Sequence, residues 1–150
     1  ESRAIFQQRY VFFVREGSGV TWDGEVLSGA VRPVGATAGY SVVDDLTALG
    51  LSVETERNQL INFRKLQEGR TDAYAELQTM AEPYLTQNGG QIAGVVRLEP
   101  AIVEKPYYLM LSHPFYDAHP DLSEAIWDQI AAINNSGDLA RIEARYRDDN

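Results

Sequence analysis

The sequence AVRPVGATAGYSVVDDL (residues 30–46) decides the fold of this chain. Its apolar part, residues 31–35, predicts a strand, and a break around Gly39 leads into a helix with two aspartates in its first turn. Gly39 tolerates the positive φ of a sharp turn, and Ser41 with Asp44 forms a partial capping box. The first amides of such a helix can hold a small carboxylate. The turn therefore predicts either a ligand-binding edge or a plain capped connection.

Strand and helix signals alternate from this stretch onward to Leu98. The expected strands are residues 31–35, 51–55, 71–75 and 92–98, and the expected helices follow caps at Ser41, Asn58 and Thr79, the last paired with Glu82. This alternation predicts an α/β fold with a mainly parallel sheet flanked by helices. In open sheets of this kind, ligands bind beyond the carboxyl ends of the strands.

The pattern changes after Leu98. Two X-Pro steps bracket residues 99–106, which we expect to be a linker, and residues 107–112 predict a strand. A helix follows whose apolar stripe needs a partner surface. The stripe consists of Leu122, Ile126, Ile130 and Ile133, with Trp127 at its edge, and a last helix after Gly137 continues it through Leu139, Ile142 and Tyr146.

Composition excludes several classes of function. The 150 residues carry a formal charge of −9 with scattered basic side chains, so nucleic acid is not an expected partner. The absence of cysteine excludes a disulfide framework, a thiolate metal site and a cysteine nucleophile. No apolar stretch approaches the roughly 20 residues of a membrane helix.

Catalytic and metal-binding patterns are weak. His113 and His119 stand near Asp117 and Asp121, but the Pro-punctuated sequence predicts a loop that does not hold them on one face. The sequence contains no GxSxG elbow, HExxH helix or Gly-rich phosphate loop. We therefore expect no catalytic residue, no metal site and no cofactor.

Four segments in order resemble the extracytoplasmic solute-binding proteins of family 3, the amino-acid-type periplasmic binding proteins of ABC transporters. They are GRTDAYAEL (69–77), AEPYL (81–85), KPYYLMLS (105–112) and NSGDLARIEARY (135–146). YVFFVREGS (10–18) is similar to the strand and turn that this family carries in mid-chain.

The resemblance implies two lobes with the ligand in the cleft between them. It assigns residues 1–30 to the incoming strand and turn at the end of the first lobe, 31–98 to the second lobe, 99–106 to the hinge linker, and 107–150 to a C-terminal strand and helices of the first lobe. It also implies that these residues lack the family's opening half, so that only the returning C-terminal part of the first lobe is present.

The same resemblance implies a set of ligand-binding residues. Gly39, Tyr40 and Ser41 occupy the family's Gly-Thr-Thr turn, which meets the ligand carboxylate, and Thr37 precedes them. Leu77 aligns with an aspartate that accepts the ligand ammonium, and a shift of one residue would place Glu76 or Gln78 in the cleft. An open alternative is that Glu76 is a solvated strand end.

The expected function is non-enzymatic capture of a small polar solute, such as an amino acid or organic acid, by hinge closure. The resemblance implies an ABC transporter permease as partner and a periplasmic or extracytoplasmic location. The alternatives are an extracytoplasmic ligand-sensing domain of a signalling protein and a dehydratase-like enzyme. The exposed stripe also predicts a homodimer that exchanges the C-terminal segment.

Overall fold

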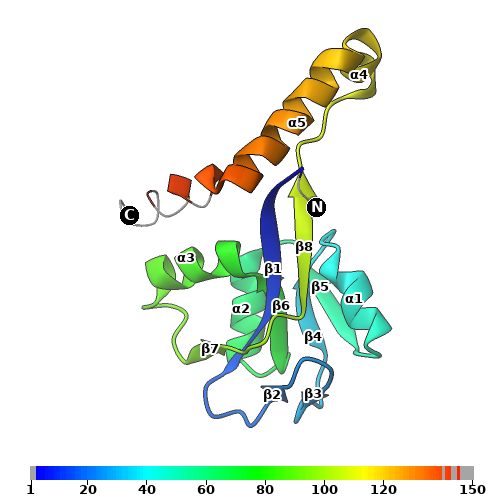
Figure 1. Cartoon of the computed structure of the whole chain (residues 1–150). Coiled ribbons are helices and arrows are strands. Elements are labelled where there is room, and N and C mark those ends of the chain that lie inside the picture. Colours follow the sequence, from blue (N-terminus) through cyan, green and yellow to red (C-terminus); the bar gives the residue numbers. More distant parts are fainter. Residues whose placement is uncertain (1–2, 140, 143–144, 146–150) are drawn as a thin grey trace. The chain divides into compact units, whose positions relative to one another are not determined.

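The computed structural model describes residues 3–139, 141–142 and 145, and the chain divides into two compact units. The larger unit is Gln8–Glu104, and the smaller unit combines Glu1–Gln7 with Lys105–Asn150. Two paired strands, β1 (Ala4–Arg15) and β8 (Val103–Tyr108), belong partly to each unit (Figure 1).

A mixed sheet forms the centre of the larger unit. Its strand order is β5–β4–β6–β1–β7, with β8 also paired to β1. The strands not yet defined are β4 (Val34–Thr37), β5 (Val53–Glu56), β6 (Ala73–Leu77) and β7 (Val95–Arg97). Strand β4 lies parallel to both β5 and β6, whereas β1 runs antiparallel to β6 and β7. The predicted α/β class is confirmed.

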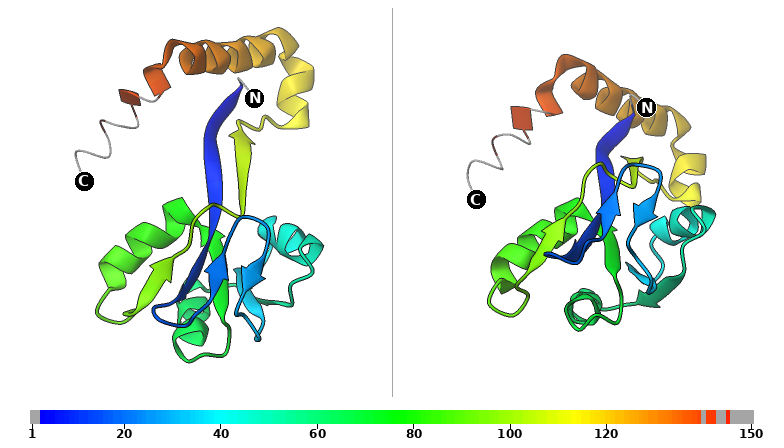
Figure 2. Two further views of the ribbon diagram at one scale, coloured as in Figure 1. Left: turned by 60° about the horizontal axis from the view of Figure 1, so that its bottom comes forward. Right: turned by 90° about the horizontal axis from the view of Figure 1, so that it is seen from below.

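Helices cover both faces of this sheet (Figure 2). They are α1 (Val42–Ala48), α2 (Gln59–Gln67) and α3 (Gln78–Asn88). Successive residues of β1 point to opposite faces, so Phe12 joins a buried cluster with Leu46 of α1, while Phe13 joins another with Phe63 of α2 and Ala81 of α3. The short hairpin of β2 (Thr21–Trp22) and β3 (Leu27–Ser28) adds Trp22, whose ring centroid lies 5.1 Å from that of Phe12.

All four strands predicted up to Leu98 begin two or three residues later than expected; 51–55 is Val53–Glu56, and 92–98 is Val95–Arg97. The expected strand 31–35 is Val34–Thr37, because the N–H groups of Val31 and Arg32 donate to Asp72 Oδ2 at 2.9 and 2.8 Å instead of to a neighbouring strand. Residue 33 is a proline and has no N–H to donate. The expected strand 71–75 is Ala73–Leu77, which starts directly after the same aspartate.

Of the three predicted caps, at Ser41, Asn58 and Thr79, one makes a side-chain hydrogen bond to its helix. Asn58 caps α2 as expected, since its side chain accepts a hydrogen bond from the Ile61 N–H at 3.3 Å. Ser41 stands at the N-cap of α1, but its side chain makes no cap hydrogen bond. The Thr79 capping box is wrong: α3 already begins at Gln78, and the Thr79 hydroxyl donates to Gln8 Oε1.

The C-terminal segment differs in two ways from its expected structure. Strand β8 begins at Val103, inside the stretch expected to be a linker, and carries Pro106 as edge strands can. The loop expected around the histidines is partly helical, because Ser112 caps α4 (His113–Ala118) by accepting from the Phe115 N–H.

The long predicted helix is α5 (Pro120–Ser136), which ends at Gly137 with φ 76°, a value that glycine adopts readily. Leu139 and Ile142 fall in further helical residues, and Tyr146 lies outside the described residues. Within the described part of the chain, no helix combines the length and apolar character needed to span a membrane.

Candidate functional site

The carboxyl ends of β4 and β6 share one edge of the sheet. The two strands are parallel neighbours in a register that places Ala36 beside Ala75. Beyond Thr37 the chain turns into α1, and beyond Leu77 it enters α3 directly. Because ligands of open α/β sheets bind outside such strand ends, this edge is the candidate site.

The turn after β4 is open to solvent. Gly39 and Ser41 are exposed, Gly39 has φ 85°, and a side chain placed at Gly39 would meet no atom within 4 Å. The Tyr40 N–H donates to the Thr37 carbonyl at 3.2 Å, which closes the turn. The Tyr40 ring stands edge-on to Tyr10 of β1, with centroids 6.3 Å apart. Gly39 and Ser41 therefore lie at the surface of this edge, beside a half-buried aromatic ring.

Helix α1 offers little room for an anion at its amino end. It is only seven residues long, and its first turn already contains Asp44 and Asp45. Their carboxylates complement the positive end of the helix and repel a second negative charge. A ligand at this edge would therefore contact the turn itself more favourably than the helix end.

Glu76 lies inside the core at this edge, with only 2% of its surface exposed. Its Oε2 accepts hydrogen bonds from the Thr37 hydroxyl at 2.5 Å and from the Tyr74 hydroxyl, and its Oε1 accepts the Leu77 N–H at 2.8 Å. Burial, with the nearby charge of Glu76, raises the pKa of Tyr74 far above its usual value, so Tyr74 remains a donor. Glu76 is thus neither a solvated strand end nor a group facing solvent.

Thr37 shares this buried position. Its hydroxyl lies 2.9 Å from that of Tyr74 and donates to Glu76, so the side chain faces the core. The sequence itself carries a signal for this arrangement. In the strand sequence AYAEL, Tyr74 and Glu76 are two residues apart and therefore share one face.

Gln78 begins α3 and is bound to Arg9 of β1. Its Oε1 accepts from Arg9 Nη1 at 3.0 Å, and its Nε2 donates to Glu82 Oε1 at 3.1 Å. Arg9 also donates to Glu99 Oε2 at 3.0 Å and Glu104 Oε1 at 2.9 Å. Sequence reasoning missed Arg9, because β1 is distant from this edge in the sequence.

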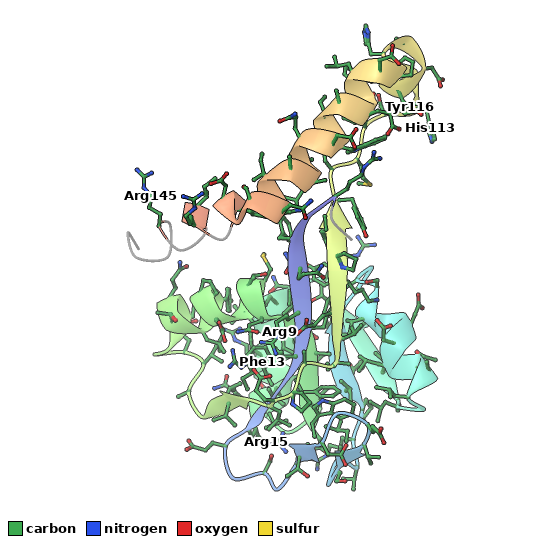
Figure 3. The ribbon with its side chains drawn as sticks, in the orientation of Figure 1. Arg9, Phe13, Arg15, His113, Tyr116 and Arg145 are labelled. Carbon is green, nitrogen blue, oxygen red and sulfur yellow. The ribbon has the colours of Figure 1, made fainter. Side chains whose placement is uncertain are left out.

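Arg97 of β7 closes this arrangement into a ring. It pairs with Glu82 and with Glu99 Oε1, the latter at 3.0 Å. The ring of Arg9, Gln78, Glu82, Arg97 and Glu99 thereby ties β1 and β7 to the start of α3. Figure 3 shows Arg9 on β1, above Phe13 and Arg15 on the same strand. Gln78 is half-buried and belongs to a surface network with β1 and β7, which lie across β6 from β4.

The aspartate of the GRTDA segment lies at the opposite end of β6. Asp72 accepts from the backbone N–H groups of Val31 and Arg32 and from Arg15 Nη2 at 3.1 Å. Burial acts to raise the pKa of Asp72, but these hydrogen bonds and the Arg15 charge outweigh it, and the pKa lies below its usual value. Asp72 therefore binds the backbone before β4 to the start of β6, at the amino ends of these two strands, and does not belong to the candidate site.

The two histidines lie in another part of the chain. His113 begins α4, and His119 follows that helix. Among the residues that the structure describes, no group of three histidine, aspartate or glutamate side chains is arranged to hold a metal ion.

No family model matches this sequence, and no curated protein matches it. Solved structures do match its fold. An ancestral arginine-binding protein bound to glutamine gives a TM-score of 0.69 at 21% identity, covering 95% of this chain and 60% of that one. The ligand-binding core of GluR0 in complex with L-glutamate gives 0.70 at 14% identity, covering 95% and 61%.

A third solved structure is the arginine-, lysine-, histidine-binding protein ArtJ from Geobacillus stearothermophilus, with a TM-score of 0.66, 15% identity, and coverage of 95% and 60%. The chain thus spans about 60% of the length of these neighbours. At such identities the likeness concerns the fold, and the chain is built around a periplasmic-binding-protein-like lobe of mixed α/β structure.

Proposed function

We propose that this chain is part of a non-enzymatic solute-binding protein that captures a small polar molecule, such as an amino acid or organic acid. The observation that carries the proposal is the exposed turn at the shared carboxyl edge of β4 and β6. The fold built around this edge matches proteins solved with glutamine and with L-glutamate. Ligand binding at such strand ends is the general behaviour of open α/β sheets.

The proposed ligand contacts divide into two groups. The backbone of Gly39, the ring of Tyr40 and the hydroxyl of Ser41 would meet the ligand from the turn, and Gln78 would meet it from the start of α3. Thr37 and Glu76, whose side chains point into the core, would support the site from below. This division keeps all six residues that the sequence suggests but gives two of them an indirect role.

We further propose that the remainder of the cleft comes from the first lobe, to which residues 1–7 and 107–150 contribute strand and helices, with residues 99–106 lying in the hinge. Residues 8–30, which the resemblance assigned to the end of the first lobe, belong to the larger unit. The match to about 60% of each neighbour's length supports this organisation. Hinge closure would then bury the ligand between lobes. Alone, the 150 residues should bind more weakly than about 1 mM, because half of the contacts would be absent.

Nuclear magnetic resonance titration of the ¹⁵N-labelled chain tests the site. L-glutamine, L-arginine and succinate are added separately while the amide signals are followed. At least one should shift residues 39–41 and 78 and leave the amino ends of the strands unaffected. Ser41→Ala should reduce these shifts, whereas the matched control Ser52→Ala, which precedes β5 at the opposite edge, should not. Shifts confined to other residues, or none with any of the three, would contradict the proposed site.

The proposed partner is an ABC transporter permease, in a periplasmic or extracytoplasmic location. An extracytoplasmic ligand-sensing domain is the alternative, because a fold shared with an amino-acid-binding protein and with a ligand-binding core suits either role. A pull-down with a membrane-embedded permease, with and without ligand, separates the two, because a sensor domain should not bind it in either condition.

A homodimer is also proposed, through exchange of the C-terminal segment. Apolar side chains of this segment are exposed: Leu122 by 52% and Ile133 by 40%. Closed twofold dimers are the commonest way to cover such a face. Light scattering should give twice the monomer mass, and Leu122→Glu with Ile133→Glu should restore the monomer. A monomeric parent at high concentration would refute exchange.

A further inference from the structure

The carboxylate of Glu76 connects the end of β4 to its own strand, β6. Through the Thr37 hydroxyl it holds the end of β4. Within β6 it accepts hydrogen bonds from the Tyr74 hydroxyl and from the N–H of Leu77, the residue directly before α3. These are the parts of the chain from which the turn 38–41 and α3 emerge. One buried group therefore contacts both strand ends of the candidate edge.

Such a group tolerates few alternative geometries. A buried carboxylate is costly unless its oxygens accept hydrogen bonds, and here each oxygen has at least one donor. A sliding of β4 against β6, or a rotation of the start of α3, would remove a donor and leave a buried charge partly unsatisfied. The hydrogen bonds of Glu76 thus penalise any change in the spacing of the two strand ends.

We infer that Glu76 is a positioning residue that fixes the turn 38–41 relative to the start of α3, with Thr37 and Tyr74 as its partners. The inference rests on the proposed function only in calling this edge a ligand site. The geometric role itself concerns the chain without ligand. This role predicts that loss of the carboxylate increases local opening of the candidate edge more than it destabilises the rest of the larger unit.

Asp72 provides a matched control on the same strand. It is also a buried carboxylate with several donors, but it lies at the amino end of β6, where it holds Val31 and Arg32. Replacing either acid by its amide removes one charge and changes little volume. A local role for Glu76 therefore appears as a difference between two chemically similar variants.

The experiment is amide hydrogen exchange of the full ligand-free chain, comparing the parent with Glu76→Gln and Asp72→Asn. Rates are corrected for the change in global stability measured on the same samples. In Glu76→Gln, the amides of Leu77 and Tyr40 should exchange about tenfold faster after correction. In Asp72→Asn, the acceleration should be confined to the Val31 and Arg32 amides. Equal corrected rates at Leu77 and Tyr40 in all three proteins would overturn the inference.

A second pair of variants covers the case in which Glu76→Gln does not fold. Thr37→Val removes the hydroxyl at nearly constant shape and suits a strand, whereas Thr37→Ser keeps the hydroxyl. Faster exchange at Tyr40 in Thr37→Val, rescued in Thr37→Ser, supports the positioning role. The same behaviour in both variants would refute it.

Titration of the exchange samples with L-glutamine separates this inference from the proposed function. If the edge amides respond to Glu76→Gln but no amide responds to L-glutamine, L-arginine or succinate, the proposed ligand site fails and the positioning role stands. If L-glutamine shifts the edge amides equally in the parent and in Glu76→Gln, with unchanged exchange rates, the ligand site stands and the positioning role fails.

Discussion

The two units of this chain differ in how they bury their side chains. The larger unit contains two buried clusters, one on each face of its sheet, and they include the fully buried Phe12 and Phe63. In the described part of the smaller unit, only Ala4 and Ser123 are buried. Because apolar burial is the main favourable term in folding, the larger unit carries most of the stability. The smaller unit offers apolar surface for further contacts.

The largest expected effect tests this difference directly. Phe63→Ala removes a ring that contacts Phe13, Tyr74 and Tyr84, with centroid distances of 5.8, 5.0 and 5.9 Å. The free energy of unfolding should fall by about 3–5 kcal/mol. The matched change Ile130→Ala in α5 should cost less than about 1 kcal/mol, because Ile130 is only half-buried. Urea denaturation measures both, and equal losses would show that the smaller unit has a core of its own.

The next effect concerns acid stability of the larger unit. The pKa of Asp72 lies below its usual value in the folded chain, because the donors from Val31, Arg32 and Arg15 outweigh burial. Its stabilisation is therefore complete above the unfolded pKa of about 3.9 and is lost as the pH falls through the lower, folded value.

Asp72→Asn should consequently lower the free energy of unfolding by about 1–3 kcal/mol at pH 7 and flatten its dependence on pH in the acid range. Denaturation at a series of pH values down to 2.5 measures this dependence. Glu124→Gln removes a partly exposed acid of the smaller unit that is paired with Arg3; it serves as the control and should change this dependence little. The same acid dependence in Asp72→Asn as in the parent would contradict the assigned role of Asp72.

A smaller effect is expected from the ring around Arg9. Its ion pairs are partly exposed, and such pairs contribute about 0.2–1 kcal/mol each. Arg9→Gln should therefore destabilise the larger unit by about 1 kcal/mol in low salt, and by less in 1 M salt, where charges are screened. Urea denaturation at both salt concentrations measures this. A loss that does not depend on salt would mean that Arg9 acts through packing.

The sequence predicts the α/β class well because the periodicity of apolar residues reports burial, which dominates this fold. It places α1, α2 and α5 correctly for the same reason, together with Asn58 and Gly137 at helix ends. It misplaces the starts of β4 and β6, because Asp72 binds backbone amides 40 and 41 residues away. Contacts of that range leave no local pattern.

The candidate site was less predictable. Gly39 has the positive φ that the turn demands, as the sequence indicates. The orientation of Glu76 and the involvement of Arg9 depend on which strands become neighbours. Strand β1 enters the sheet between β6 and β7, antiparallel to β6, an arrangement that alternating strand and helix signals do not reveal. The sequence identifies candidate residues of the site but not the directions in which their side chains point.

The smallest expected effect belongs to Ser41. A serine that caps a helix contributes about 1 kcal/mol, and the sequence suggests such a cap. In the structure Ser41 has helical backbone angles, φ −66° and ψ −14°, and its side chain makes no cap hydrogen bond. Ser41→Ala should therefore change the free energy of unfolding by less than about 0.5 kcal/mol, as surface substitutions usually do.

Asn58→Ala, which removes a cap hydrogen bond on α2, should cost about 1 kcal/mol under the same conditions. If Ser41→Ala destabilises the chain as much as Asn58→Ala, the hydroxyl caps α1 in solution, and a ligand would have to displace it. If it does not, the Ser41 hydroxyl can bind a solute at no cost to the helix.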